Sequence, residues 1–127
     1  MKEKQRLLVV EDHETIVRIL HLCLSDIFDI DVATTVAELE SRLVESDEAK
    51  KYFAIVLDGR LGVDFTQPSD TLPFIPQCKT KARHVLASSA DAPTRNLMVQ
   101  AGCDAQCEKV MIHNHLINLH KEAGQTP

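Results

Sequence analysis

Aromatic residues are scarce in this sequence, and tryptophan is absent. Only 4% of the 127 residues are aromatic, whereas 44% are hydrophobic, so the core must consist mainly of aliphatic side chains. A chain of this length suits one domain with one core. We expect that domain to cover residues 1–123, and we expect residues 124–127 to form a tail or a truncated linker.

Long apolar runs and excess positive charge are missing as well. No run approaches membrane-spanning length, and the N-terminus leads into only four apolar residues, too few for a secretory signal. The four cysteines form no dense framework, so we expect reduced thiols in a cytoplasmic protein. The net charge of -5 argues against direct electrostatic binding of nucleic acid. Neither a membrane nor a nucleic acid is therefore an expected partner.

Short apolar runs are present, and they alternate with helical patterns. The clearest run, residues 53–57, stops at Asp58-Gly59. Five apolar residues in a row fit a strand that is buried on both faces, as in a parallel sheet. Strands are predicted at residues 7–10, 30–33, 53–57, 84–88 and 105–108.

A helical pattern follows each predicted strand. The first begins at Glu14, and Thr35 has the residue type and spacing of a helix cap for the second. Three prolines predict only a short or broken helix near residues 69–78. The fourth helix starts after Asp91, and the last carries Ile112 on its apolar face. This alternation predicts an α/β fold, a doubly wound five-stranded parallel sheet with helices on both faces.

Polar residues stand at the predicted carboxyl ends of four strands. In a parallel sheet these ends share one edge, where ligands bind. Crowded carboxylates raise one another's pKa or recruit a cation, and Mg²⁺ is the natural partner of an all-oxygen site. A lysine and a hydroxyl beside them would complete a pocket for a phosphoryl group. The candidate residues are Glu11, Asp12, Asp58, Ser88, Ser89 and Lys109.

The order and spacing of these segments resemble the receiver domain of two-component response regulators. The resemblance covers nearly the whole chain and implies a flavodoxin-like sheet of strand order 2-1-3-4-5. It also implies a phosphorelay role and Mg²⁺ as the cofactor. The segments that carry it are residues 7–12, 54–58, 85–90 and 101–104, together with Lys109.

The resemblance implies a role for each matching residue. Asp58 matches the phosphoacceptor and would also contact the metal. Asp12 matches a direct Mg²⁺ ligand, and Glu11 an acid that holds the metal, often through water. The backbone carbonyl of Arg60 matches the third protein ligand, and Lys109 the lysine that pairs with phosphoryl oxygens.

The hydroxyl of the family falls on either of two neighbouring serines. Ser88 keeps the distance to Gly102 closer to the family pattern, whereas the small Ala90 that follows favours Ser89. The spacing favours Ser88 slightly, and both serines are candidates for the residue that binds the phosphoryl group and switches.

The chain departs from the family pattern at three positions. Val110 replaces the usual proline after the lysine, and Gln106 stands at the aromatic switch position. Gly59, next to the acceptor, has no side chain to position a water, and the usual proline of that loop is missing. These departures raise the question of how a signal would leave the acceptor site.

Two classes of function follow from the resemblance. The first is a receiver that takes a phosphoryl group from a sensor histidine kinase or a phosphotransfer protein, without further substrate turnover. Its switched surface, formed by the fourth helix, fifth strand and fifth helix, would engage an output domain or a homodimer partner. The second is a degenerate receiver, a phosphorylation-independent interaction module.

Other interpretations fit the residues less well. A haloacid dehalogenase-type phosphatase needs a second acid where this chain has Arg60. Zinc binding by Cys103, Cys107, His113 and His115 lacks a standard ligand spacing. Taken alone, Asp58-Gly59 is also a common turn pair, and acids after a strand favour the start of the next helix.

Overall fold

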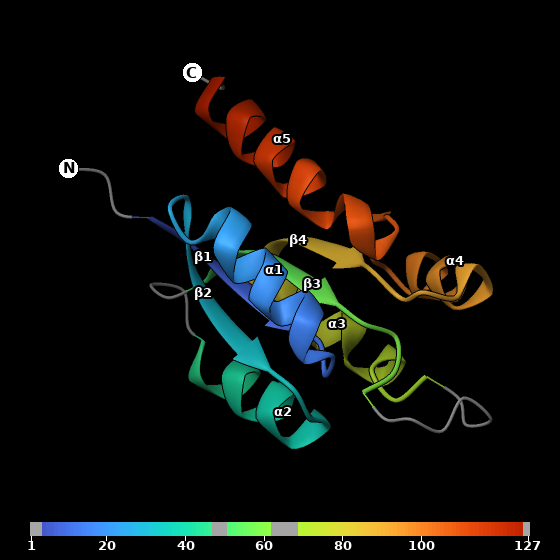
Figure 1. Ribbon diagram of the computed structural model, residues 1–127. Coiled ribbons are helices and arrows are strands. Elements are labelled where there is room, and N and C mark those ends of the chain that lie inside the picture. The colour runs from blue at the N-terminus through green and yellow to red at the C-terminus, as the bar shows by residue number, and fades with distance from the viewer. Residues whose placement is uncertain (1–3, 47–50, 62–68, 126–127) are drawn as a thin grey trace.

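A five-stranded parallel sheet forms the centre of the protein (Figure 1). The computed structural model describes residues 4–46, 51–61 and 69–125. The strand order is β2-β1-β3-β4-β5, so the predicted fold class is confirmed. The strands are β1 (Gln5–Val10), β2 (Phe28–Ala33), β3 (Tyr52–Leu57), β4 (Ala82–Ala87) and β5 (Ala105–Gln106).

Helices cover both faces of the sheet. Side chains of α1 and α5 enclose the core on one face, and those of α2, α3 and α4 on the other; Figure 1 shows α1 and α5 lying over the same side. No helix within the described ranges is long and apolar enough to cross a membrane. The helices are α1 (Glu14–Leu24), α2 (Val36–Glu45), α3 (Ile75–Lys81), α4 (Ala92–Gln100) and α5 (Ile112–Gln125), with 3₁₀ turns η2 (Leu72–Phe74) and η3 (Lys109–Met111).

The central strand β3 is buried along its whole length. It pairs with β1 on one side and with β4 on the other, and helices cover both of its faces. This position explains its unbroken apolar sequence, because no residue of the strand faces water. The β3 strand therefore ends at a fixed point in the molecule, and Asp58 is the next residue.

The ends of α4 are set by its sequence. The Asp91 carboxylate accepts a hydrogen bond from the Thr94 amide (3.1 Å), which caps the first turn. After the last turn, Gly102 adopts a φ of +126°, and its amide donates to the Val99 carbonyl (3.0 Å). Glycine is favoured there because it lacks the Cβ that disfavours this conformation. The predicted start of this helix after Asp91 is confirmed.

Three segments differ from the sequence prediction. The short, broken helix expected near residues 69–78 is present, but it begins and ends later, as the 3₁₀ turn η2 followed by α3, which ends at Lys81. Pro73 and Pro76 stand in the first turns of these two elements. Strand β5 has two residues, since the chain turns into η3 soon afterwards. Helix α5 continues through Gln125, so residues 124 and 125 of the expected tail are helical. Pro68 and residues 126–127 lie outside the described residues.

Candidate functional site

Two neighbouring strands deliver three carboxylates to one edge of the sheet. Glu11 and Asp12 directly follow β1, and Asp58 directly follows β3. Backbone hydrogen bonds extend the sheet by one residue, from the Glu11 amide to the Ala33 carbonyl and from the Asp58 amide to the Val10 carbonyl, both 3.0 Å. The backbones of Glu11 and Asp58 are therefore tied into the sheet.

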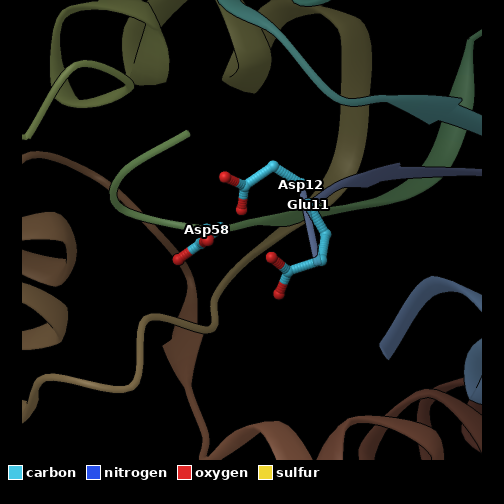
Figure 2. A group of neighbouring side chains, drawn as sticks. All are labelled: Glu11, Asp12 and Asp58. Atoms are coloured by element: carbon cyan, nitrogen blue, oxygen red, sulfur yellow. The ribbon is translucent and has the colours of Figure 1, made fainter. Parts of the chain in front are cut away.

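The three acidic side chains point toward a common space (Figure 2). One carboxylate oxygen from each of Glu11, Asp12 and Asp58 lies within 4.8 Å of the others. Glu11 and Asp58 are only 3% and 8% exposed, whereas Asp12 reaches solvent. Within the described part of the chain, no other group of three such side chains could hold a metal, so no zinc cluster forms there from Cys103 and its neighbours.

Lys109 contributes a positive charge to this acidic cluster. It begins η3, just beyond β5, and its side chain is largely buried. The ammonium group contacts the Glu11 carboxylate and lies 3.4 Å from Oδ1 of Asp58. The structure thus brings together the lysine and the three acids that the sequence singled out.

The charges at this cluster are unevenly balanced. Burial raises the pKa of Asp58 to about 7; the nearby Lys109 opposes this shift, and Glu11 adds to it. Burial also disfavours the charge on Glu11, but its hydrogen bond to Lys109 and the charge of that lysine bring its pKa below the ordinary value. Burial and Glu11 raise the pKa of Asp12. Lys109 therefore stabilises Glu11 first, and Asp58 is left short of positive charge.

Of the two candidate serines, Ser89 reaches the site. A cavity of about 470 Å³ is lined by the acids, Lys109, Arg60 and Ser89, whereas Ser88 is not among its lining residues. Ser88 instead continues the sheet, since its amide donates to the Leu57 carbonyl (3.0 Å). Both serines are buried, so burial alone does not distinguish which of them belongs to the site.

Two hydroxyl groups that sequence reasoning missed hold the backbone after β3. Thr71 is fully buried and donates to the carbonyl of Asp58 (2.7 Å). Ser69 donates to the carbonyl of Gly59. Both residues come from the proline-rich segment before η2, where no periodic pattern marks a functional position. They fix the direction of the chain as it leaves Asp58.

Helix α4 lies directly against the segment after Asp58. A Cβ atom at Gly59 would come within 2.6 Å of Cγ2 of Thr94, so the close approach explains the missing side chain. The guanidinium of Arg60 donates to the Thr94 hydroxyl (3.1 Å) and lines the cavity. Thr94, which sequence reasoning also missed, thus links the first turn of α4 to the acceptor segment.

Comparisons with known proteins identify the class of this fold. The sequence matches no family model and no curated protein. Among solved structures, a CheY-like receiver domain protein from Methanospirillum hungatei is 16% identical with a TM-score of 0.70, covering 95% of this chain and 94% of that one. A signal receiver domain from Bacteroides fragilis is 15% identical with a TM-score of 0.71, covering 98% and 100%.

A third solved structure of similar fold contains a phosphorylated residue. This response regulator from Burkholderia pseudomallei contains a phosphorylated aspartic acid, a calcium ion and citrate. It is 21% identical with a TM-score of 0.70, and the match covers 95% of this chain and 71% of that one. The present chain therefore has the fold of response regulator receiver domains, with an acidic cluster suited to a divalent metal at one sheet edge.

Proposed function

We propose that this protein is a phosphorylatable receiver of a two-component phosphorelay. Its Asp58 would accept a phosphoryl group from a partner histidine kinase or phosphotransfer protein. The observation that carries this proposal is the convergence of Asp58 with Glu11, Asp12 and Lys109 around one cavity. The receiver fold supports the same conclusion, because that fold brings strand ends together at such an edge.

The donor set at this edge fits a magnesium ion. Three crowded carboxylates with one lysine leave an excess of negative charge, and burial, with a smaller contribution from Glu11, raises the pKa of Asp58. Hard divalent cations prefer such oxygen ligands. The side chains of Glu11, Asp12 and Asp58 and the carbonyl of Arg60 would hold Mg²⁺. When bound, Mg²⁺ supplies positive charge that offsets the charge on the transferring phosphoryl oxygens.

The residues of the chain itself then have distinct tasks. A carboxylate oxygen of Asp58 attacks phosphorus while the bond between phosphorus and the donor histidine nitrogen breaks, and that nitrogen keeps the electron pair. Lys109, already 3.4 Å from Oδ1 of Asp58, pairs with a phosphoryl oxygen. The Ser89 hydroxyl, at the same cavity, donates to another. Thr71 keeps the Asp58 backbone fixed during the transfer.

Phosphorylation would bias a two-state switch rather than begin a catalytic cycle. Movement of Ser89 toward the phosphoryl group would draw on the loop before α4, and the face of α4, β5 and α5 would repack. That face would engage an output domain or a second copy of the chain. The protein would perform no chemistry beyond its own phosphorylation and dephosphorylation.

Treatment with acetyl phosphate tests the acceptor assignment. We expect the wild-type protein with Mg²⁺ to gain one phosphoryl group, measured by intact mass spectrometry, because acetyl phosphate needs no partner protein. Asp58→Asn should gain none, and a chelator should prevent the modification of the wild type. Ser88→Ala is a matched control, because Ser88 is not among the residues that line the cavity.

Two results would contradict the proposal in different ways. Modification that survives Asp58→Asn would refute the acceptor assignment. No modification of the wild type, under conditions that modify a control receiver, would favour the phosphorylation-independent interaction module. One observation favours that second function: Gln106 at the aromatic position is exposed and polar, so it cannot signal by burying a ring.

A further inference from the structure

Arg95 connects the proposed hydroxyl loop to strand β5. It lies one residue after Thr94 in α4, and its side chain is half-buried. One terminal nitrogen, Nη1, donates to the carbonyl of Ser89 (2.7 Å). The Nε nitrogen of the same guanidinium donates to Oε1 of Gln106 (3.2 Å). A single side chain thus joins the loop at the site to the position where the family pattern has an aromatic ring.

The connection continues to the surface of α4. The side-chain amide of Gln106 donates to Oδ1 of Asn96 (2.8 Å), and both residues are exposed. A chain of three hydrogen bonds therefore runs from the Ser89 carbonyl, through Arg95 and Gln106, to Asn96. One end touches the cavity residue Ser89, and the other end lies on the exposed face of α4 and β5.

The chemistry of arginine suits this bridge. The guanidinium is planar and carries five donors in a fixed fork, so two acceptors in different elements constrain its position together. A lysine ammonium is a compact charge on a flexible stem without this fixed fork, so it would not constrain the two acceptors in the same way. Displacement of one acceptor therefore disturbs the hydrogen bond to the other.

We propose that Arg95 is the positioning residue that couples the Ser89 loop to the α4–β5 face through Gln106 and Asn96. The proposal rests on the proposed function, because the Ser89 hydroxyl must move toward a phosphoryl group on Asp58. Since Arg95 binds the carbonyl of the same serine, this movement changes the hydrogen bond that orients the guanidinium. The Gln106 and Asn96 side chains then rearrange, so a polar chain does the work of the missing ring.

A spectroscopic experiment can follow both ends of this chain at once. Beryllium trifluoride with Mg²⁺ mimics a phosphoryl group on an aspartate, and the Gly59 backbone amide reports its binding beside Asp58. The side-chain amide of Gln106 reports the far end. In the wild type we expect both NMR signals to shift when the mimic is added. In Arg95→Lys we expect the Gly59 shift to keep its size and the Gln106 shift to be lost.

A control variant and a second route make the result interpretable. Arg83→Lys is the same substitution at the amino end of β4, against the Phe53 ring, and should leave both shifts unchanged. Gln106→Ala removes an exposed side chain, so it should fold even if Arg95→Lys does not. The Asn96 side-chain amide should shift in the wild type as well, and in Gln106→Ala its shift should be lost while the Gly59 shift remains.

Other results would overturn either the coupling role of Arg95 or the proposed function. A Gln106 shift of wild-type size in Arg95→Lys, or an Asn96 shift that survives Gln106→Ala, overturns the coupling role, because the response then bypasses the chain. A wild-type protein in which Gly59 shifts and Gln106 does not overturns it as well. A wild-type protein in which Gly59 itself is silent overturns the proposed function, and the coupling role with it.

Discussion

The amino and carboxyl edges of the sheet differ in how their charged side chains are paired. At the amino edge, Lys4 donates to the carbonyl of Ser25 (2.9 Å), and Lys81 donates to the carbonyl of Ser46 (2.7 Å). These carbonyls lie at the ends of α1 and α2, where partial negative charge favours a cation. Arg6 pairs with Asp31 at 2.9 Å. Each of these basic residues stabilises the fold through a contact of its own.

At the carboxyl edge, by contrast, negatively charged side chains lie close together, and they outnumber the positive charges that contact them. Glu11, Asp12 and Asp58 share one space, and a single lysine contacts two of them. Burial raises the pKa of Asp58 to about 7, and the neighbouring Glu11 adds to this shift. Such an arrangement costs stability unless a further positive group binds. The basic residues of the amino edge therefore pair with groups of the fold, whereas the carboxyl edge gathers an acidic cluster suited to a divalent metal.

The largest effect is expected where packing prevents the carboxyl edge from relaxing. Gly59→Ala should lower the free energy of unfolding by about 2 kcal/mol, because its Cβ would meet Thr94 in a tightly packed region. Urea denaturation measures this change. A loss well below this value would show that the segment after Asp58 can move away from α4.

A second glycine provides the control for that substitution. Nothing lies within 4 Å of a Cβ placed on Gly124, which is in the last turns of α5. Gly124→Ala should therefore be neutral or slightly stabilising, since alanine favours a helix more than glycine does. Equal losses at the two positions would show that the close contact at Gly59 has no special weight.

Removal of the central acid should stabilise the protein when no metal is present. Asp58→Asn should raise the free energy of unfolding by about 1–2 kcal/mol at a pH well above the Asp58 pKa, because a buried, crowded charge is lost. The pKa in the folded state, about 7, lies above the ordinary value of 3.8, so ionisation disfavours folding. The wild type should therefore lose stability as pH rises between these values, and the variant should lose less.

The dependence on pH and on Mg²⁺ distinguishes this explanation from a simple packing effect. The stability difference between Asp58→Asn and the wild type should shrink below the ordinary carboxyl pKa, where the wild-type side chain is neutral too. Mg²⁺ should raise the thermal midpoint of the wild type more than that of the variant. If Asp58→Asn were less stable than the metal-free wild type at every pH, ionised Asp58 would not destabilise the metal-free fold.

The fold could be predicted from the sequence because its signals are local and repeated. The apolar run before Asp58, the cap at Asp91 and the glycine at position 102 each act within a few residues. The parallel sheet then follows from alternation, since its strand ends must meet at one edge. That geometry also brought Glu11, Asp12, Asp58 and Lys109 together, as expected.

The remaining features depend on contacts between distant segments. Thr71 donates to the backbone carbonyl of Asp58, which is 13 residues away along the chain. Thr94 accepts from the side chain of Arg60, which is 34 residues away. Ser88 and Ser89 are identical in residue type, so the sequence could not separate them. Only the structure shows that Ser89 lines the cavity and that Ser88 is not among its lining residues. Nothing in the local sequence distinguishes Arg95 from other polar helix residues. Its two acceptors, on Ser89 and Gln106, come from other segments of the chain.

The smallest effect is expected at the amino edge, from Arg6→Ala. Its guanidinium donates to Asp31 (2.9 Å) and to the Tyr52 hydroxyl (3.3 Å), and its central carbon lies 4.4 Å from the centre of the Tyr52 ring. The pair with Asp31 is about one third exposed, so solvent weakens it. We expect a loss of about 0.5–1 kcal/mol in the free energy of unfolding, without any gain at high pH.

Salt concentration separates the ion-pair contribution to this loss from the contribution of the ring contact. Added salt should reduce the Arg6→Ala effect only in part, because it screens the exposed ion pair but not the ring contact. Arg83→Ala is the matched control, since its guanidinium carbon is 5.5 Å from the Phe53 ring centre and the residue is exposed. It should cost less. If Arg6→Ala instead stabilised the protein, the amino edge would resemble the carboxyl edge, because its charges too would then cost stability.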